Sequence, residues 1–280
     1  MCPFPQPHPV LDNMFNLSMT FRMDSDILFT YGSAVDAKLP GGDESAIEAQ
    51  IKDWYRSKSR LAGWTVSHCY TASRREEYIK QLRTFIPVDV YGKCSGLWGI
   101  LGGAGHERHA HLIRDKYKFY LAFENRLCKD YITEKFWVDA LMNGAIPVVR
   151  GGMHDSDYAM QAPPGSYINA DWFDSPRELG AYLQVVAANY TLYRSYHAWR
   201  LTHQLTVHDV HWHRNQVAER RAMCFLCAWL HGNQHALPEM KLNLTRFWDG
   251  STQCRPPLDV APQSLLDNQN KHMDLAWQGR

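Results

Sequence analysis

Two spacings of apolar residues alternate along the middle of the chain, one typical of strands and the other typical of helices. Short apolar runs predict five strands, at residues 61–69, 88–92, 118–125, 145–149 and 166–170. Apolar residues at helical spacing predict helices at residues 44–58, 73–85, 133–142, 175–188 and 191–201. Strands that alternate with helices indicate an α/β fold, in which helices cover both faces of a parallel sheet.

Polar residues at the expected helix starts support this division. Ser73, followed by Glu76 three residues later, forms a capping-box pattern. Thr133 is placed to cap the helix over residues 133–142, and Asn143-Gly144 supplies a C-terminal stop. Ser175-Pro176 opens the helix at residues 175–188 in the same way.

The rest of the chain is less regular. Residues 1–14 are rich in proline and are expected to form a loop, and residues 14–32 contain short β-like runs interrupted by Asp24-Ser25-Asp26. Residues 93–116 are rich in glycine and histidine, which predicts a long loop with one helical turn. Residues 251–280 are expected to form a disordered tail.

The balance of charge limits the partners of the chain. Its 280 residues include 30 Lys and Arg against 29 Asp and Glu, and 45% of them are hydrophobic. A chain without an excess of positive charge is not expected to bind nucleic acid, although the sequence still allows a local site for an anion. No apolar run is long enough to cross a bilayer, and the N-terminus lacks the pattern of a signal peptide.

Other features point towards the secretory pathway. N-x-S/T sequons begin at Asn16, Asn189 and Asn243. The seven cysteines leave at least one without an intrachain partner. Secretory sequons in a chain without a targeting segment suggest that an N-terminal piece is missing.

The connection over residues 124–135 is unusually rich in charged and polar side chains. Ligands of α/β sheets lie beyond the carboxyl ends of strands, where helix N-termini favour phosphate. Lys135 adds a cation, Glu134 can accept hydrogen bonds from sugar hydroxyls, and Tyr131 offers a ring face or a hydroxyl. These groups together suit a nucleotide sugar. A solvated helix start with a pair of neighbouring charges is the alternative interpretation.

Two common nucleotide motifs are absent from the sequence. The chain contains neither G-x-G-x-x-G nor G-x-x-x-x-G-K-[ST], which disfavours a dinucleotide oxidoreductase and a P-loop NTPase. Asp24-Ser25-Asp26 has the spacing of a metal-binding D-x-D element but stands away from the phosphate candidates. We therefore expect cationic side chains, and no protein-bound metal, at the diphosphate.

A series of segments in fixed order resembles the α1,3-fucosyltransferases, and invertebrate members of that family most of all. The resemblance covers residues 14–250 and rests on "FNLSMTFRMDSDI", "VDVYGKC", "YKFYLAFEN", "KDYITEKFW", "GAIPVVRGG", "APPGSYINADWFDSPRELGAYL", "NYTLYRSYHAWR" and "CFLC". It implies a two-domain glycosyltransferase of the GT-B type. Residues 1–58 would then be a remnant of the acceptor domain with its linker, residues 59–250 a Rossmann-like GDP-fucose-binding domain, and residues 251–280 the tail.

The resemblance also implies a donor site and a reaction. The residues that match the family's donor contacts are Arg74, Asn125, Tyr131, Glu134 and Lys135. Fucose would pass from GDP-fucose, with inversion, to a GlcNAc residue of an N-glycan or a LacNAc-type glycan. Arg74 and Lys135 would stabilise the negative charge that grows on GDP. No cofactor would be required, and a divalent cation would at most stimulate the transfer. The full-length enzyme would face the Golgi lumen, held by a membrane anchor that this chain lacks.

Departures from the family pattern raise a second hypothesis. The glutamate that serves the family as general base, in a Glu-Ser-Pro element, has no match in this chain, so the catalytic residue is unassigned. The alternative function is therefore a catalytically silent GDP-sugar-binding fragment. Arg126 and Arg150 replace smaller or uncharged residues of relatives, and they would either tighten GDP binding or obstruct fucose.

Cysteine and histidine residues near the C-terminus allow two interpretations. Cys224-x-x-Cys227 with His231 and His235 has features of a zinc site, but ligands along one short segment favour a disulfide. The resemblance implies a bond back to N-terminal cysteines, of which Cys2 would be the surviving partner. We expect a solvated loop for the cluster of His203, His208, His211 and His213, and helix packing for Trp199-Arg200.

Overall fold

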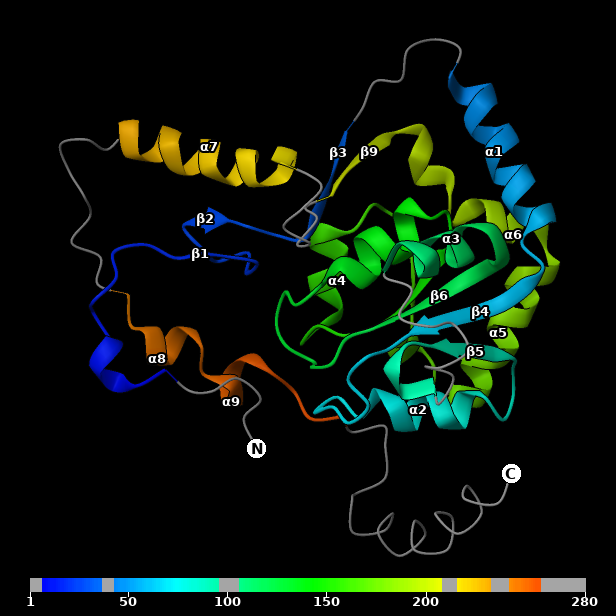
Figure 1. Ribbon diagram of the computed structural model, residues 1–280, viewed down its shortest axis with the longest axis horizontal. Helices are drawn as coiled ribbons and strands as arrows, with labels where there is room; N and C mark the ends of the chain where they lie inside the picture. Colours follow the sequence, from blue (N-terminus) through cyan, green and yellow to red (C-terminus); the bar gives the residue numbers. More distant parts are fainter. Residues whose placement is uncertain (1–6, 37–42, 96–105, 208–215, 233–241, 258–280) are drawn as a thin grey trace, which may run out of the picture.

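A five-stranded parallel sheet forms the centre of the computed structural model, which describes residues 7–36, 43–95, 106–207, 216–232 and 242–257 (Figure 1). The strands follow the order β5-β4-β6-β7-β8, and each neighbouring pair is parallel. They are β4 (Arg60–Thr65), β5 (Val88–Tyr91), β6 (Tyr117–Phe123), β7 (Ile146–Arg150) and β8 (Ile168–Asn169). All five predicted strands are present, which confirms the expected α/β fold class.

Strand β6 shows how the sheet separates two layers of core. Phe119, Leu121 and Phe123 point to one face, whereas Tyr120 and Ala122 point to the other, as the period of two in a strand requires. All five side chains are at most 1% exposed. A strand buried on both faces must have helices above and below the sheet.

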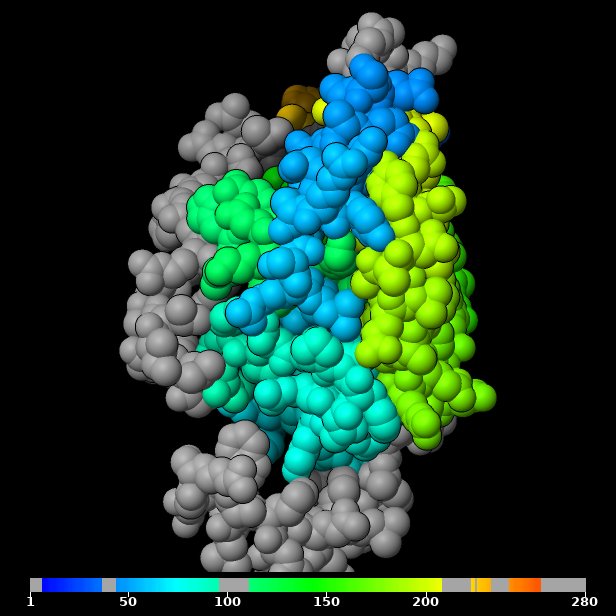
Figure 2. Space-filling model, turned by 90° about the vertical axis from the view of Figure 1, so that its right-hand side faces the viewer, coloured from blue at the N-terminus to red at the C-terminus, as the bar shows by residue number. Residues whose placement is uncertain are grey.

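The helices divide between these two faces. On the face of Phe119, the core is completed by residues of α1 (Asp43–Ser57), α2 (Arg75–Leu82), α5 (Pro176–Ala188) and α6 (Tyr190–Ser195). On the face of Tyr120, it is completed by α3 (His106–Lys116), the π-helix Lys135–Met142 and α4 (Asp155–Gln161). Figure 2 shows α1 lying along the yellow-green surface of α5 and α6, where Arg194 Nε donates to Glu48 at 2.8 Å.

The order of the strands creates a switch point. The chain passes from β4 outwards to β5, then returns across β4 to β6 and continues in the other direction to β7 and β8. The connections that leave β4 and β6 therefore diverge at the same edge of the sheet. In sheets of this order, ligands bind at this crevice. We call residues 66–74 the β4 loop and residues 124–134 the β6 loop.

Further elements lie outside the sheet, most of them at the left of Figure 1. The first two strands, β1 (Met19–Thr20) and β2 (Ile27–Leu28), form a parallel pair, and β3 (Gly32–Asp36) pairs antiparallel with β9 (His203–Val207). The helices of this region are α7 (Gln216–Gly232), α8 (Leu244–Phe247) and α9 (Gly250–Gln253). Short 3-10 helices occur at Pro9–Leu11, Lys93–Ser95, Ala170–Trp172 and Ala198–Leu201.

Two predicted helix starts differ from the structure. The hydroxyl of Ser73 donates to the Glu124 carbonyl at 2.7 Å and does not cap α2, while Glu76 accepts from the Thr71 amide at 2.9 Å. The hydroxyl of Thr133 donates to the carboxylate of Glu124 and does not cap its helix. In both places the hydroxyl donates to Glu124, the buried residue directly after β6, and the sequence pattern alone does not include that partner.

Three predicted boundaries were also wrong. The loop expected at residues 93–116 ends in the eleven-residue helix α3, and the helix expected at 191–201 is divided between α6 and a 3-10 turn. The expected tail at 251–280 begins too early, because a disulfide joins Cys254 to Cys128 and the Arg255 amide donates to the Leu127 carbonyl at 2.8 Å. Residues 258–280 lie outside the described part of the chain. Among the described residues, no helix has both the length and the hydrophobicity needed to cross a bilayer.

The C-terminal end of the π-helix carries two cations, one buried and one partly buried. The ammonium of Lys58, which is 1% exposed, donates to the Asn143 carbonyl at 2.9 Å, and the guanidinium of Arg200 donates to the Leu141 carbonyl. Cations suit this end of a helix, where carbonyl groups lack intrahelical partners. Burial, followed by the charge of Arg200, nevertheless lowers the pKa of Lys58 to about 7. Trp199 is 4% exposed in the core, which confirms its expected packing role.

We predict that Lys58 makes stability rise with pH. Because its pKa is about 7 in the folded protein and about 10.4 in an unfolded chain, the unfolded state binds more protons between these values. Raising the pH from 7.5 to 9.5 should therefore increase the free energy of unfolding of wild type by about 2 kcal/mol relative to Lys58→Met. Denaturant unfolding at both pH values measures this. The exposed Lys52 of α1 supplies the matched control, because Lys52→Met should keep the wild-type dependence; equal slopes for Lys58→Met and wild type would contradict the prediction.

Candidate functional site at the switch point

The β4 and β6 loops are joined by hydrogen bonds just beyond the sheet. The Ser73 amide donates to the Asn125 carbonyl at 3.1 Å, and the Ser73 hydroxyl donates to the Glu124 carbonyl at 2.7 Å. The Glu124 amide in turn donates to the carbonyl of Arg150, at the end of β7, at 2.9 Å. Residues from three strand ends are therefore held in one layer.

Two buried arginines hold this layer by hydrogen bonds to backbone carbonyl groups. Arg75 Nη1 donates to the Phe123 carbonyl, and Arg150 Nη1 donates to the Ser73 carbonyl, each at 2.7 Å. Arg150 is fully buried, with its guanidinium 5.1 Å from the centre of the Tyr78 ring. The sequence-based hypothesis that Arg150 acts on a ligand is therefore wrong, because the side chain holds the β4 loop against the core.

A buried carboxylate organises the β6 loop. Glu124 is 0% exposed, and one of its oxygens accepts from both the amide and the hydroxyl of Thr133 at 2.8 Å. Its other oxygen accepts from Lys135 Nζ at 3.1 Å. Lys135 also donates to Glu134 at 3.1 Å and to the Thr133 hydroxyl at 2.7 Å. One cation is thus shared between two carboxylates at the start of the π-helix.

This sharing determines which charges persist in the site. Burial works against the ammonium of Lys135, but Glu124 and Glu134 together raise its pKa above the ordinary value. Burial likewise opposes ionisation of Glu134, and Lys135 outweighs it and lowers the pKa of that carboxyl. Burial and then the charge of Glu124 raise the pKa of Tyr131, so its phenol keeps its proton. Lys135 therefore stays charged and oriented at neutral pH.

Arg74 occupies an unusual backbone conformation at the entrance to α2. Its φ of 50° and ψ of 32° lie in the left-handed region, which is uncommon for residues other than glycine. The side chain is 14% exposed and pairs with Glu77 one turn later. Because Ser73 is bonded to Asn125, this conformation places Arg74 directly beside the β6 loop.

The structure places Tyr131, Glu134 and Lys135 close together, and it links Arg74 to Asn125 through the backbone hydrogen bond of the neighbouring Ser73. Arg74 comes from the β4 loop, and the other four, Asn125, Tyr131, Glu134 and Lys135, come from the β6 loop and the first turn of the π-helix. From the sequence we assigned no role to Glu124 and expected Thr133 only to cap the helix, but both side chains accept from the ammonium of Lys135 and position it. A glutamate directly after the apolar run Phe119–Phe123 was the one available signal, since a charged residue that is buried there needs a paired partner.

Two disulfides, neither of them predicted, hold the same loops. Cys69 of the β4 loop is joined to Cys94 beyond β5, and Cys128 of the β6 loop is joined to Cys254 beyond α9. Each bond thus attaches a loop of the candidate site to a segment that is distant in the sequence. Disulfides at these positions restrict the motion of Arg74 and Tyr131 relative to the sheet.

The other candidate residues are placed elsewhere. Cys224 and Cys227 are free, exposed thiols of α7, so the disulfide expected for them is wrong in this structure, and Cys2 and His235 lie outside the described residues. His203 begins β9 and lies 3.2 Å from Asp36, in a strand and not in the expected loop. The described residues contain no group of three or more metal-ligating side chains arranged around a metal position. His208, His211 and His213 lie outside the described residues.

The site combines features that proteins use to bind phosphorylated sugars. It lies at the switch point of a parallel sheet, next to a helix N-terminus, and it carries a persistent ammonium, a guanidinium and an ionised carboxylate. These define the class as a Rossmann-like α/β domain with a candidate anion site. Residues 55–244 match the family described as glycosyltransferase family 10 (fucosyltransferase), C-terminal part, and the chain belongs to this family.

Several relatives are similar over most of this chain. Alpha-(1,3)-fucosyltransferase C of Drosophila melanogaster is 37% identical over 230 residues, which are 78% of this chain and 49% of the relative. Glycoprotein 3-alpha-L-fucosyltransferase A of the same organism is 32% identical over 256 residues, which are 90% and 47% respectively. The chain thus spans about half the length of these curated relatives. A solved alpha1,3-fucosyltransferase structure is 18% identical, with a TM-score of 0.48, over 84% of this chain and 63% of its own.

We predict strong energetic coupling between Glu124 and Lys135. Glu124→Gln should lower the free energy of unfolding by about 2–4 kcal/mol, because it removes the fully buried one of the two carboxylates that pair with the partly buried ammonium of Lys135. The double variant Glu124→Gln/Lys135→Met should lose clearly less than the sum of the two single variants, with a coupling of about 1–3 kcal/mol. Denaturant unfolding of the four proteins gives the cycle.

The exposed pair Arg114–Asp115 is the control for this cycle, since both side chains are more than half exposed. Asp115→Asn should change stability little, as is usual for surface pairs. Additive losses at Glu124 and Lys135 would contradict the account of the pair.

Proposed function

We propose that this chain binds GDP-fucose at the switch point and forms the donor half of an α1,3-fucosyltransferase. The observation that carries the proposal is the shared cation: in a chain of the fucosyltransferase family, Lys135 is held charged between Glu124 and Glu134 at the edge where such sheets bind nucleotides. The names of the relatives, which are α1,3-fucosyltransferases, agree with this assignment.

In this proposal the two cations act on the diphosphate. Breaking the bond between fucose and GDP moves negative charge onto the departing nucleotide. Lys135, at the start of the π-helix, and Arg74, on the β4 loop, would stabilise that charge from the two sides of the switch point. Because Glu124 and Glu134 keep the pKa of Lys135 raised, the ammonium does not need to gain a proton when the donor binds.

The remaining site residues would contact the sugar and the nucleotide. Glu134 has a pKa held below its ordinary value, so as a carboxylate it can accept hydrogen bonds from sugar hydroxyls. Asn125 and Tyr131 flank it on the β6 loop and would complete the donor contacts. Metal-free charge neutralisation is part of the proposal, with a divalent cation at most stimulatory.

The proposed acceptor is a GlcNAc residue of a glycoprotein glycan, either an N-glycan core or a LacNAc-type antenna. The proposed location is the lumenal side of the Golgi membrane. Two observations support that compartment: the disulfides Cys69–Cys94 and Cys128–Cys254, which oxidising compartments favour, and the exposed positions of the three sequon asparagines.

Binding of the donor without transfer is the second candidate function. Asp24 and Asp26 are the carboxylates that would replace the unmatched family base. The carboxylate of Asp26 accepts from the amide of Ser18 at 2.8 Å and from its hydroxyl at 2.7 Å. Asp24 pairs with Arg22 and with Lys129. Both carboxylates therefore have structural partners, which favours this second candidate for the chain by itself.

We predict that GDP binds to the 280-residue chain and that Lys135 contributes to its affinity. Lys135→Ala should weaken binding by about 1.5–3 kcal/mol, since one charge-assisted contact is removed. Arg74→Ala should weaken GDP binding comparably, and this variant leaves the ion pair between Glu124 and Lys135 intact. Isothermal titration calorimetry with GDP measures both, and circular dichroism confirms that each variant is folded.

Lys80 provides the matched control, because it is an exposed lysine of α2 outside the crevice. Lys80→Ala should bind GDP as wild type does. The assignment fails if wild type shows no GDP binding, or if Lys135→Ala and Arg74→Ala bind GDP as tightly as wild type does.

A further inference from the structure

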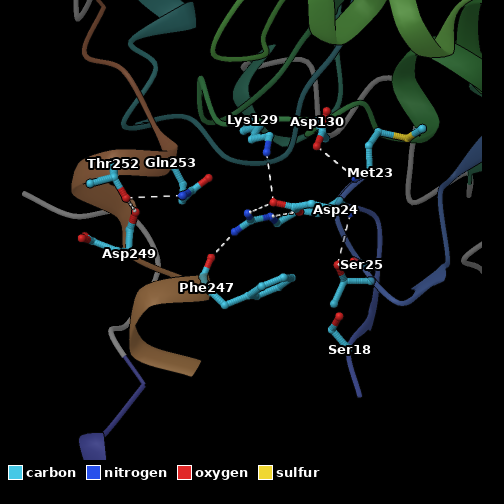
Figure 3. A network of polar contacts seen from close by, with 12 residues as sticks. Ser18, Met23, Asp24, Ser25, Lys129, Asp130, Phe247, Asp249, Thr252 and Gln253 are labelled. Carbon is cyan, nitrogen blue, oxygen red and sulfur yellow. Dashed lines mark hydrogen bonds and ion pairs between the residues drawn. The ribbon is translucent and has the colours of Figure 1, made fainter. Parts of the chain in front are cut away.

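The N-terminal segment, residues 18–36, is attached to the β6 loop by a network of polar contacts (Figure 3). Lys129 Nζ donates to Asp24 at 3.0 Å, and the Met23 amide donates to Asp130 at 2.9 Å. Arg22, which is 4% exposed, donates through Nε to Asp24 at 2.8 Å and also donates to the carbonyl of Phe247 in α8. The segment is therefore held from two sides, by the β6 loop and by α8.

An aromatic cluster continues this attachment towards the site. The ring of Phe21 lies 5.2 Å from the ring of Tyr131 and 6.5 Å from the ring of Tyr31, measured between centroids. Trp248 closes the other side of Phe21 at 5.8 Å. Phe21 thus connects a residue of the candidate site to Tyr31, which stands ten positions later in the chain.

Gly32 allows the next part of the segment to lie directly on the π-helix. A Cβ atom at Gly32 would lie 2.5 Å from the ring of Trp137, so any side chain there would collide with it. Trp137 belongs to the first turn of that helix, two residues after Lys135. The close approach of the backbone brings Tyr31 to the end of the helix where Lys135 and Glu134 lie.

The surroundings of Tyr31 combine apolar and charged groups. Its side chain is partly buried and packs against the core cluster that includes Phe136 and Trp137. Burial, followed by the charges of Glu134 and Glu124, raises the pKa of its phenol. The hydroxyl therefore keeps its proton at neutral pH and can donate or accept a hydrogen bond.

We propose that Tyr31 is a specificity-determining residue that contacts the transferred sugar of the donor, opposite Glu134. This inference rests on the proposed function. A pyranose has an apolar C–H face and a rim of hydroxyls. A partly buried aromatic ring can cover that face while its phenol and a facing carboxylate take the hydroxyls. The nucleotide is bound by Arg74 and Lys135, so Tyr31 discriminates the sugar and not the nucleotide.

Comparing GDP with GDP-fucose distinguishes a contact to the sugar from a role of Tyr31 in packing alone. We would measure the dissociation constants of GDP and GDP-fucose by calorimetry for wild type, Tyr31→Phe and Tyr31→Ala. Tyr31→Phe should weaken GDP-fucose about threefold to tenfold, the loss expected for one hydrogen bond. Tyr31→Ala should weaken it further, and GDP should bind both variants within about twofold of wild type.

Two further variants refine the test. Tyr182→Phe is the matched control: this hydroxyl bonds to Tyr196 at 2.6 Å, on the face of the sheet opposite the π-helix, and its loss should leave both constants unchanged. Asp24→Asn weakens the attachment to Lys129 and should lower the preference for GDP-fucose over GDP in the same direction as Tyr31→Phe.

The outcomes are distinguishable. If the ratio of the dissociation constants of GDP and GDP-fucose is unchanged in both Tyr31 variants, the role of Tyr31 is overturned while the GDP site stands. A wild-type chain that binds no GDP overturns the proposed function and this inference together.

Discussion

The buried carboxylate of Glu124 is the interaction on which the rest of the site depends. It directly follows the central strand β6, both faces of which are covered by core, and its side chain is 0% exposed, so the carboxylate has no access to water. Such a carboxylate is tolerated only when every lone pair has a partner, and here Thr133 and Lys135 supply the partners. Gly151 allows this arrangement, because a Cβ there would lie 2.9 Å from Glu124 Cγ. The contacts of Glu124 thus fix the position of Thr133, just before the π-helix, and the direction of the Lys135 side chain in its first turn.

The topology of the sheet gives this local constraint its functional meaning. Because the strand order reverses between β4 and β6, the loops that follow them border one crevice, and Ser73 joins them through Glu124 and Asn125. Cys69–Cys94 and Cys128–Cys254 then anchor each loop to a different part of the chain. The N-terminal segment adds a third support through Asp24 and Phe21. A site assembled from such separated segments can hold charged groups in fixed positions before a ligand arrives, which limits the ordering that binding requires.

The sequence predicted the sheet well because its signal is local. Each strand from β4 to β8 is a short apolar run, and the alternation of Phe119, Tyr120 and Leu121 is visible without any knowledge of contacts. The five candidate site residues could be named through a family resemblance, and the structure gathers them at one edge. Their supports could not be found in this way, because the partners are distant in sequence: Arg150 bonds to Ser73, Cys128 to Cys254, and β3 to β9. Ser73 and Thr133 were wrongly predicted to cap helices for the same reason. The sequence shows the nearby helix starts, but it does not show that both hydroxyls donate to the buried Glu124 directly after β6.

The central claim is that a nucleotide binds where the β4 and β6 loops meet, around the cation that Glu124 holds. Amide hydrogen exchange of the 280-residue chain, followed by mass spectrometry with and without GDP, tests it most directly. The account predicts slower exchange on GDP addition in peptides covering residues 66–74 and 124–135, with little change in α7 or in the β3–β9 pair. Protection confined to other segments, or no change in these two loops at saturating GDP, would contradict it.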